Sequence, residues 1–195
     1  MKNICVFASG NGTNFEAIVE GINKGIIKNA CVKMLIVDRK NAYVIERAKR
    51  LNIPYTYINA LKFSSREEYE EEIVRILSRF DIDLICLAGY MKIITNVLLT
   101  KYENKIINIH PALLPSFKGA HGILDAFNYG CKVFGVTIHH VSSELDGGKI
   151  IAQRAFEYYG NDIFALEAKI HEVEHVLYPE VINKLIEGEL KWEEL

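Results

Sequence analysis

Short runs of β-branched and other apolar residues alternate along this chain with stretches whose apolar residues recur at helical spacing. The runs predict strands at residues 3–8, 32–37, 55–58, 84–88, 106–109, 134–141 and 150–157. Strands that alternate with helices form parallel crossover units, and successive units build one sheet covered by helices. The sequence therefore predicts an α/β fold, with a mainly parallel, twisted sheet and helices on both faces.

The amphipathic stretches predict the helices that cover this sheet. They lie at residues 14–24, 42–51, 65–80, 96–102, 122–129 and 162–187. The last two strands depart from the parallel pattern, because the segment 144–148 between them contains Asp146-Gly147. An Asp-Gly pair between strand runs is typical of a hairpin. We therefore expect an antiparallel extension at the C-terminal end of the sheet.

The length and the connecting segments favour a single domain. A chain of 195 residues is long enough for one substantial hydrophobic core. Its connections are brief, and it has no internal repeat and no Ser/Gly-rich linker. We therefore expect one domain over residues 1–195.

Charge and cysteine content narrow the class of protein. The 23 Lys and Arg against 25 Asp and Glu leave a formal charge of −2, which is too balanced for a dedicated nucleic-acid binder. The four cysteines lie far apart, without metal-binding or redox spacing. No secretory signal is recognisable, and no apolar run approaches the roughly 20 residues of a membrane span. We expect a cytoplasmic protein with neither a nucleic-acid nor a membrane partner, and the sequence specifies no oligomeric state.

The first predicted strand ends in a loop of small and polar residues, SGNGTN at positions 9–14, that opens a helix. The unpaired amides of a helix start and the absence of bulky side chains allow an anion to approach closely. The loop matches neither the dinucleotide fingerprint nor the P-loop. Its glycines also fit a tight turn, so a phosphate site and a purely structural turn both stay open here.

The motif Asn108-Ile109-His110-Pro111 ends the fifth predicted strand. Residues two apart on a strand project from the same face about 6 to 7 Å apart, so Asn108 and His110 should point together. An amide donor beside an imidazole can stabilise an oxyanion and move a proton. The structural alternative is a hydrogen-bonded polar pair at a strand end.

Asp146 lies in the loop before the last predicted strand, where Gly147 and Gly148 allow close backbone approach. A turn-forming aspartate is the usual explanation for such a residue. If the loop folds toward His110, the carboxylate favours the protonated imidazole and holds the ring in place. Three separate segments of the chain then meet in one pocket.

The C-terminal helix contains a candidate zinc motif. The segment His171-Glu172-Val173-Glu174-His175 fits the His-Glu-x-x-His pattern of zinc proteases. The pattern is short, and the sequence offers no obvious third ligand. We therefore expect no metal site in this helix.

Taken together, these motifs resemble those of the folate-dependent formyltransferases, and the phosphoribosylglycinamide formyltransferase family in particular. The resemblance rests on GNGTN from residue 10, AGYMKI from residue 88, NIHP from residue 108, LLP from residue 113, ELDGG from residue 144, and Glu174-His175 before Tyr178-Pro179. It implies a Rossmann-like formyltransferase fold. The implied reaction transfers the formyl group of 10-formyltetrahydrofolate to the amine of glycinamide ribonucleotide, in purine biosynthesis.

The resemblance also implies a role for individual residues. Asn108 and His110 would stabilise a tetrahedral intermediate, with Asp146 assisting the histidine. The ribonucleotide would be held at its phosphate by Gly12, Thr13 and Asn14, and near its amine and ribose by Glu174. The implied folate site comprises Arg66, Met91, Lys92, Ile93, Ile94, Asn108, Ser142, Ser143, Glu144, Leu145 and Asp146.

Two residues depart from the pattern of this family. Lys92 stands where relatives often have Arg, and Lys118 stands where a Pro is common. Lysine keeps the charge of arginine but cannot make its planar, two-pronged contact. Neither departure touches the residues of the implied chemistry.

Three other functions compete with this interpretation. Formyltetrahydrofolate deformylase uses the same folate chemistry with water as acceptor, but its relatives carry an extra region ahead of the catalytic part, whereas the first strand here begins at residue 3. Methionyl-tRNA formyltransferase adds a C-terminal tRNA-binding domain, and only a short tail follows Gly188. The length therefore argues against both. A noncatalytic nucleotide-binding module, using the 10–14 loop alone, is the rival of a different class.

Overall fold

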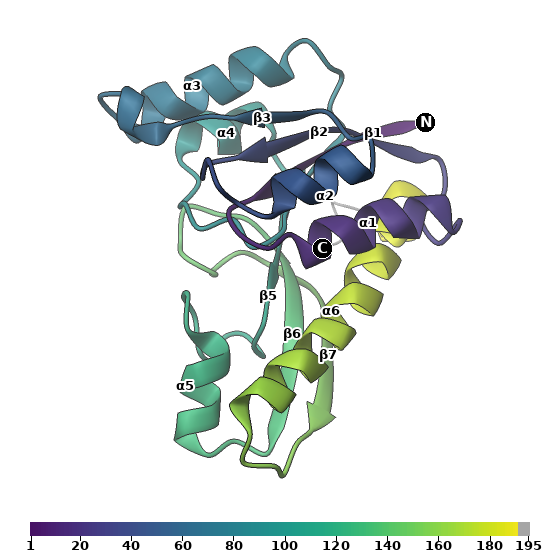
Figure 1. Cartoon of the computed structure of the whole chain (residues 1–195), viewed down its shortest axis with the longest axis vertical. Coiled ribbons are helices and arrows are strands. Elements are labelled where there is room, and N and C mark those ends of the chain that lie inside the picture. The colour runs from purple at the N-terminus through teal and green to yellow at the C-terminus, as the bar shows by residue number, and fades with distance from the viewer. Residues whose placement is uncertain (191–195) are drawn as a thin grey trace.

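The computed structural model describes residues 1–190 and arranges them around one seven-stranded sheet (Figure 1). The strands are β1 (Lys2–Ala8), β2 (Ala30–Val37), β3 (Tyr55–Tyr57), β4 (Leu84–Leu87), β5 (Ile106–His110), β6 (Val133–His140) and β7 (Ile150–Glu157). The helices are α1 (Thr13–Asn23), α2 (Val44–Arg50), η1 (Ala60–Lys62, a 3₁₀ turn), α3 (Arg66–Leu77), α4 (Asn96–Lys101), α5 (Gly122–Tyr129) and α6 (Ile163–Ile186). Each predicted strand and helix is present, with bounds that differ by a few residues.

The sheet has the strand order β3-β2-β1-β4-β5-β6-β7. Neighbouring strands from β3 to β5 are parallel, whereas β6 is antiparallel to both β5 and β7. The chain thus moves outward from β1 to β3 and then crosses back to place β4 on the other side of β1. This architecture confirms the predicted α/β class and the antiparallel C-terminal extension.

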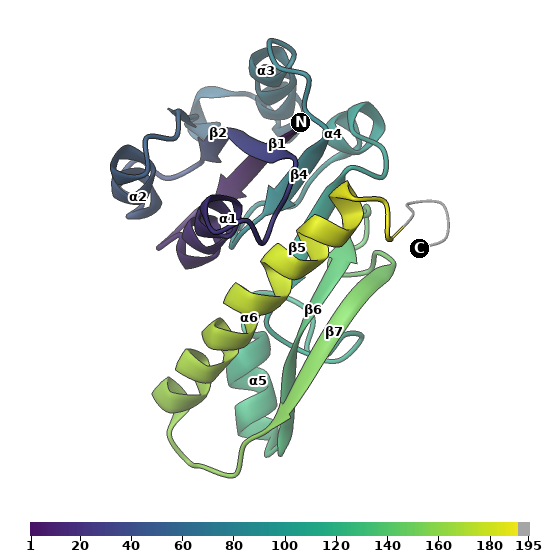
Figure 2. The same ribbon diagram turned by 90° about the vertical axis from the view of Figure 1, so that its right-hand side faces the viewer.

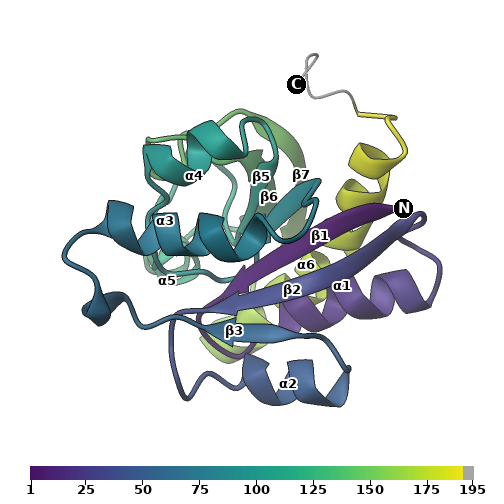
Figure 3. The ribbon, with the colours of Figure 1, turned by 90° about the horizontal axis from the view of Figure 1, so that it is seen from above.

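The central strands are buried on both faces. In β1, Ile4 and Val6 pack into one hydrophobic cluster, and Cys5 and Phe7 pack into a second cluster, because successive side chains of a strand point to opposite faces. Helices α1, α2, α5 and α6 contribute to the first cluster, and α3 and α4 contribute to the second. Figure 3 shows α3 and α4 on the opposite side of the parallel strands from α1 and α2, and Figure 2 shows α6 lying across the C-terminal half of the sheet.

Side-chain caps mark the starts of α3, α4 and α6. Ser65 Oγ accepts a hydrogen bond from the Glu68 amide at 3.1 Å, and Asp162 Oδ1 accepts one from the Phe164 amide at 2.9 Å; such caps satisfy amides that have no partner within the helix. Helix α2 begins two residues later than expected, at Val44, whose amide donates to the Gly10 carbonyl instead. Within residues 1–190, no helix is both long and apolar enough to cross a lipid bilayer.

A tyrosine hydroxyl ties the longest helix to the middle of the sheet. Tyr178 of α6 is fully buried, and its hydroxyl lies 2.9 Å from the Leu87 carbonyl of β4 and 3.3 Å from the Ile107 carbonyl of β5. Both carbonyls belong to strands that lead into the carboxyl edge of the sheet. The contact therefore fixes α6 against the strands that carry the site described below.

We predict that Tyr178→Phe lowers the free energy of unfolding by about 1 to 2 kcal/mol, because the buried carbonyls lose a donor while the ring still fills its space. Tyr159→Phe is the matched control, since Tyr159 is exposed, and it should change stability by less than about 0.5 kcal/mol. Urea denaturation of both variants measures the difference. Equal stability of the Tyr178 variant and the parent chain would contradict the assignment.

Candidate active site

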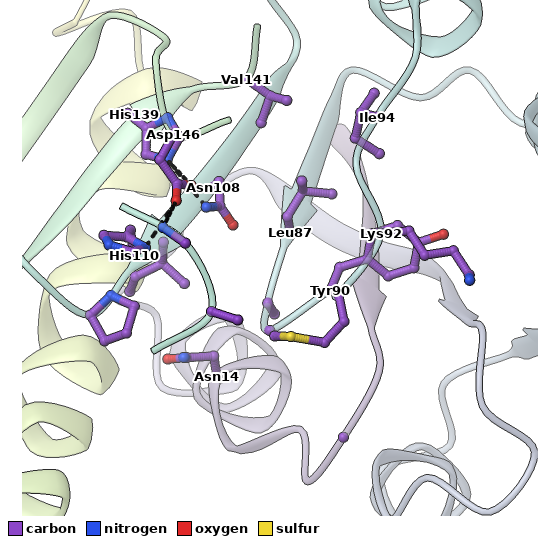
Figure 4. A pocket seen from close by; sticks show the side chains of 18 of the residues that line it. Asn14, Leu87, Tyr90, Lys92, Ile94, Asn108, His110, His139, Val141 and Asp146 are labelled. Carbon is purple, nitrogen blue, oxygen red and sulfur yellow. Dashed lines mark hydrogen bonds and ion pairs between the residues drawn. The ribbon is translucent and has the colours of Figure 1, made fainter. Parts of the chain in front are cut away.

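A cavity of about 410 Å³ opens at the carboxyl ends of β1, β4 and β5. This is the place where the strand order reverses, and ligands of open α/β sheets bind at such a point. Its lining comes from segments 10–14, 87–94, 108–111, 119–120 and 139–146, together with His171 and Glu174. Figure 4 shows polar side chains grouped around Asp146, across from a wall that includes Leu87, Tyr90 and Ile94.

Asn108 and His110 both line the cavity from β5, while Ile109 between them is buried in the core. His110 is only 4% exposed, and its Nε2 lies 2.8 Å from the Phe117 carbonyl oxygen. Because a carbonyl can only accept, Nε2 carries the hydrogen of this bond. The other ring nitrogen, Nδ1, is therefore the atom that can take up or give a proton in the cavity.

Asp146 lies between two histidine rings. One carboxylate oxygen is 3.5 Å from His110 Nδ1, and the other is 3.6 Å from His139 Nε2. The Gly119 amide also donates to this carboxylate at 2.8 Å. The His139 side chain, then the Gly119 amide and the charge of His110, lower the pKa of Asp146 to about 2, although burial opposes the shift. Asp146 is therefore ionised throughout the neutral range.

His139 is a cavity residue that the sequence analysis missed. It lies on β6 directly opposite Asn108, and the Asn108 amide nitrogen is 3.2 Å from its Nε2. The Nδ1–H of His139 donates to the His140 carbonyl at 2.7 Å, so in the neutral ring Nε2 accepts from Asn108. The signal in the sequence was a histidine within an otherwise apolar strand. Its partner, Asn108, follows only from the register of β5 with β6.

The loop after β1 presents backbone to the cavity. Gly12 has a φ of 81°, in the left-handed region, and any Cβ at this position would overlap the side chain of Val44. Thr13 begins α1, and Asn14 follows it with its side chain buried. Asn14 Nδ2 donates to Glu174 at 3.0 Å, and its Oδ1 is buried without a hydrogen-bond partner among the described residues. The loop thus combines a glycine-dependent turn with a buried polar atom.

Glu174 carries a buried carboxylate into the same cavity from α6. It is 3% exposed, and its Oε2 accepts hydrogen bonds from Asn14 and from His171 Nδ1, the latter at 2.8 Å. This contact raises the pKa of His171, whereas burial lowers that of His175. Among residues 1–190, no group of three or more His, Cys, Asp or Glu side chains could hold a metal ion together.

The opposite wall comes from the segment after β4. Met91 and Ile93 are exposed, Ile94 is buried, and the Met91 amide donates to Ser9 Oγ at 2.8 Å. Lys92 Nζ lies 3.8 Å from Asp38 and 5.8 Å from the centre of the Tyr69 ring. The wall is therefore largely apolar, with one cation at its outer end.

The loop after β6 completes the cavity. Ser142, Glu144 and Leu145 line it, and Lys118 pairs with Glu144 at 2.7 Å. Two of the expected folate-site residues do not line the cavity: Arg66 is exposed at the start of α3, and Ser143 is exposed within the loop. A role for these two residues in folate binding stays a prediction, which the structure without folate does not test.

Comparison with known proteins supports a common family. A family model described as formyl transferase matches residues 2–182. Phosphoribosylglycinamide formyltransferase of Bacillus subtilis (strain 168) is 43% identical over 187 residues, which cover 95% of each chain. The curated relative therefore matches this chain along almost its whole length.

Solved structures agree with the sequence match. The phosphoribosylglycinamide formyltransferase from Streptococcus pneumoniae TIGR4 is 47% identical, with a TM-score of 0.89 over 95% of this chain and 99% of that chain. Glycinamide ribonucleotide transformylase 1 from Symbiobacterium toebii is 38% identical, with a TM-score of 0.93 over 96% of this chain and 89% of that chain. With a family match across most of its length and a cavity at the expected edge of the sheet, the chain belongs to the formyl transferase family.

Proposed function

We propose that this enzyme transfers the formyl group of 10-formyltetrahydrofolate to the amine of glycinamide ribonucleotide, in purine biosynthesis. The observation that carries the proposal is the convergence of Asn108, His110 and Asp146 with the Gly12 loop and Glu174 on one cavity. Acyl transfer needs an oxyanion donor and a proton carrier, and a ribonucleotide needs an anion site. The relatives and solved structures named above support the same acceptor.

The ribonucleotide would bind at the α1 end of the cavity. Its phosphate fits the amides around Gly12, Thr13 and Asn14, where an anion meets the start of a helix. Glu174 would then contact the ribose and amine, since its carboxylate is buried in the same wall. This placement directs the amine toward the polar group around His110.

The formyl donor would occupy the side of the cavity lined by Leu87, Tyr90, Ile94 and Val141. A flat pterin needs an apolar slot with polar backbone groups at its edge, and the segments 87–94 and 141–146 supply both. Lys92 and the 142–145 loop would face the outer part of this donor. The residues present therefore fit the folate.

The reaction would proceed by direct attack of the amine on the formyl carbon. A carbon–nitrogen bond forms, the formyl oxygen becomes an oxyanion, and the second amide hydrogen of Asn108 and the Nδ1–H of His110 stabilise it. The proton of the attacking amine passes to N10 of the folate as the carbon–N10 bond breaks. The products are formylglycinamide ribonucleotide and tetrahydrofolate.

Asp146 would assist by its charge. Its carboxylate, ionised at neutral pH, faces Nδ1 of His110 and Nε2 of His139, and an anion at this distance stabilises positive charge that develops on the ring during the reaction. Protonated His110 can then donate toward the oxyanion as well as toward Phe117. The proposal needs no metal ion, because an amide, an imidazolium and a carboxylate supply the oxyanion and proton chemistry.

We further propose that residues 1–195 form one catalytic domain in the cytoplasm. One sheet includes every strand of residues 1–190, which supports a single domain. All four cysteines are free thiols, as is usual in a reducing compartment. The proposed partners are small molecules, with no role for nucleic acid or membrane.

An acceptor screen tests this function. The chain, incubated with 10-formyltetrahydrofolate, should release tetrahydrofolate with glycinamide ribonucleotide and not with water or methionyl initiator tRNA, and a chelator should leave the rate unchanged. Release with water alone would indicate a deformylase. Binding of the ribonucleotide without folate turnover would indicate a noncatalytic nucleotide-binding module.

We predict that Asn108→Ala and His110→Ala each lower kcat by about 100- to 1,000-fold, because each removes a donor to the oxyanion. His121→Ala is the matched control, since this exposed histidine does not line the cavity, and it should retain the parent rate. Circular dichroism checks that the variants fold. Parent-like turnover in a folded Asn108 or His110 variant would exclude the proposed role of that residue.

We predict that Asp146→Asn lowers kcat at neutral pH, because the variant lacks the negative charge that faces His110 Nδ1 and His139 Nε2. With a pKa of about 2, Asp146 in the parent chain stays ionised at every pH above about 4, so its charge faces both rings throughout that range. Asparagine keeps the size and hydrogen-bonding capacity of the side chain, so the variant tests the charge alone. Steady-state kinetics measures the change, and a parent-like kcat in the folded variant would show that the charge of Asp146 is not used.

A further inference from the structure

Arg47 of α2 reaches out of its helix to the loop that follows β1. Its Nε donates to the Asn11 carbonyl oxygen at 2.9 Å, and a terminal guanidinium nitrogen lies 2.6 Å from Asn11 Oδ1. Another terminal nitrogen pairs with Glu16 in the first turn of α1. One planar guanidinium thus contacts two acceptors on Asn11 and a carboxylate on the helix that the loop opens.

The same turn of α2 holds the preceding peptide of the loop. The Val44 amide donates to the Gly10 carbonyl at 3.1 Å, and the Val44 side chain fills the space where a Cβ of Gly12 would lie. Two successive carbonyls, those of Gly10 and Asn11, therefore point at α2. Helix α2 therefore fixes the backbone conformation of this loop.

The direction of these carbonyls fixes the direction of two amides. In a planar trans peptide, the N–H points away from the C=O of the preceding residue. Because α2 binds the carbonyls of Gly10 and Asn11, the amides of Asn11 and Gly12 point away from α2. Within the described residues, neither amide donates to a backbone carbonyl, and both residues line the cavity.

The guanidinium is itself held in place. The Arg47 side chain is 16% exposed, and its Cζ lies 5.1 Å from the centre of the Tyr43 ring. Glu16 binds Arg47 on one oxygen and Arg50 on the other, so the three charges leave one net positive charge behind the loop. A contact of this kind orients the backbone and adds attraction for an anion.

We propose that Arg47 is a positioning residue for phosphate binding, which holds the Asn11–Gly12 peptide so that its amide faces the phosphate. This inference rests on the proposed function, because it assigns the phosphate of the ribonucleotide to the same loop. Arg47 acts through the backbone and lies on the far side of the loop from the cavity. Its loss should therefore weaken phosphate binding without touching the chemistry at His110.

Arg50 offers a matched control within the same helix. It pairs with the same Glu16 but makes no hydrogen bond to the loop, and its side chain is 62% exposed. Arg47→Met and Arg50→Met each remove one positive charge and one ion pair with Glu16. The two variants differ in the contact to Asn11.

The first readout is steady-state kinetics. Arg47→Met should raise the KM for the ribonucleotide about tenfold, as loss of charge-assisted hydrogen bonds predicts, while kcat and the KM for the folate change less than about twofold. Arg50→Met should keep all three values within about twofold. A parent-like ribonucleotide KM in Arg47→Met, or an equal rise in Arg50→Met, would overturn the inference.

The variant Arg47→Lys distinguishes the effect of side-chain geometry at position 47 from the effect of its charge. Lysine keeps the charge but lacks the planar set of donors that contacts Asn11 and Glu16 together. The KM for the ribonucleotide should therefore stay at least about fivefold raised. Full recovery with lysine would show that charge alone acts, and it would contradict the positioning role.

Direct binding of inorganic phosphate distinguishes this inference from the proposed function. The amide resonance of Gly12, followed by NMR as phosphate is added to the full chain, should shift in the parent chain and in Arg50→Met. The dissociation constant should rise about tenfold in Arg47→Met. If the phosphate dissociation constant rises in Arg47→Met but the parent chain transfers no formyl group, the role of Arg47 is retained and the proposed reaction is rejected. If the parent chain transfers the formyl group but the phosphate affinity of Arg47→Met is unchanged, only the role of Arg47 is rejected.

A second variant covers the case in which Arg47→Met does not fold. Asn11→Ala removes the side-chain acceptor of Arg47 but leaves the Arg47–Glu16 pair intact, and it should raise the dissociation constant of inorganic phosphate about threefold. If Arg47→Met does fold, adding Asn11→Ala to it should have little further effect, because one contact cannot be lost twice. Parent-like phosphate affinity in Asn11→Ala, or fully additive effects in the double variant, would contradict the proposal.

Discussion

The strand order reverses at β1, with β2 on one side and β4 on the other, and the cavity opens at this point of the sheet. The loops that follow β1 and β4 leave neighbouring strands for opposite faces of the sheet, toward α1 and toward α4. A cavity opens where such loops diverge. The β1 loop supplies backbone amides, the segment after β4 supplies an apolar wall, and β5 ends between them with Asn108 and His110. One topological feature therefore brings the proposed anion site, donor site and reacting centre together.

The contacts of His110 also depend on backbone conformations that most residues avoid. Phe117, whose carbonyl accepts from His110, has a φ of 55°, and Asp146, whose carboxylate faces the same ring, has a φ of 48°. Such values cost most non-glycine residues free energy, less for aspartate than for phenylalanine. A Cβ on Gly122 would lie 3.1 Å from His110 Nε2 and 2.8 Å from the Phe117 carbonyl oxygen. The surroundings of His110 thus combine two left-handed residues with a position that has little room for a side chain.

The sequence predicts the elements of this fold well because their signals are local. Periodicity finds β1 and α6 within a few residues, and strand alternation places Asn108 and His110 on one wall. His139 was not predicted as a site residue, because its role follows from its position opposite Asn108, and these two residues lie 31 positions apart in the chain. The contact of Arg47 with Asn11 was not predicted for the same reason, since it joins residues 36 positions apart. Local patterns identify candidate groups, and tertiary structure decides which of them meet.

The proposed reaction sets two opposing demands on protonation, and the arrangement of charges answers both. The attacking amine must be unprotonated, which favours higher pH, whereas the donor to the oxyanion must be protonated, which favours lower pH. A carboxylate with a pKa of about 2 stays charged across the whole interval, so its negative charge lies beside the His110 ring at every pH at which the amine can attack. Asp146 receives its strongest stabilising contact from His139, and it accepts a hydrogen bond from the Gly119 amide. His139 and the Gly119 amide therefore keep the Asp146 carboxylate beside His110 ionised. Their contacts link β6 and the 117–120 loop to the end of β5, where the residues of the proposed chemistry lie.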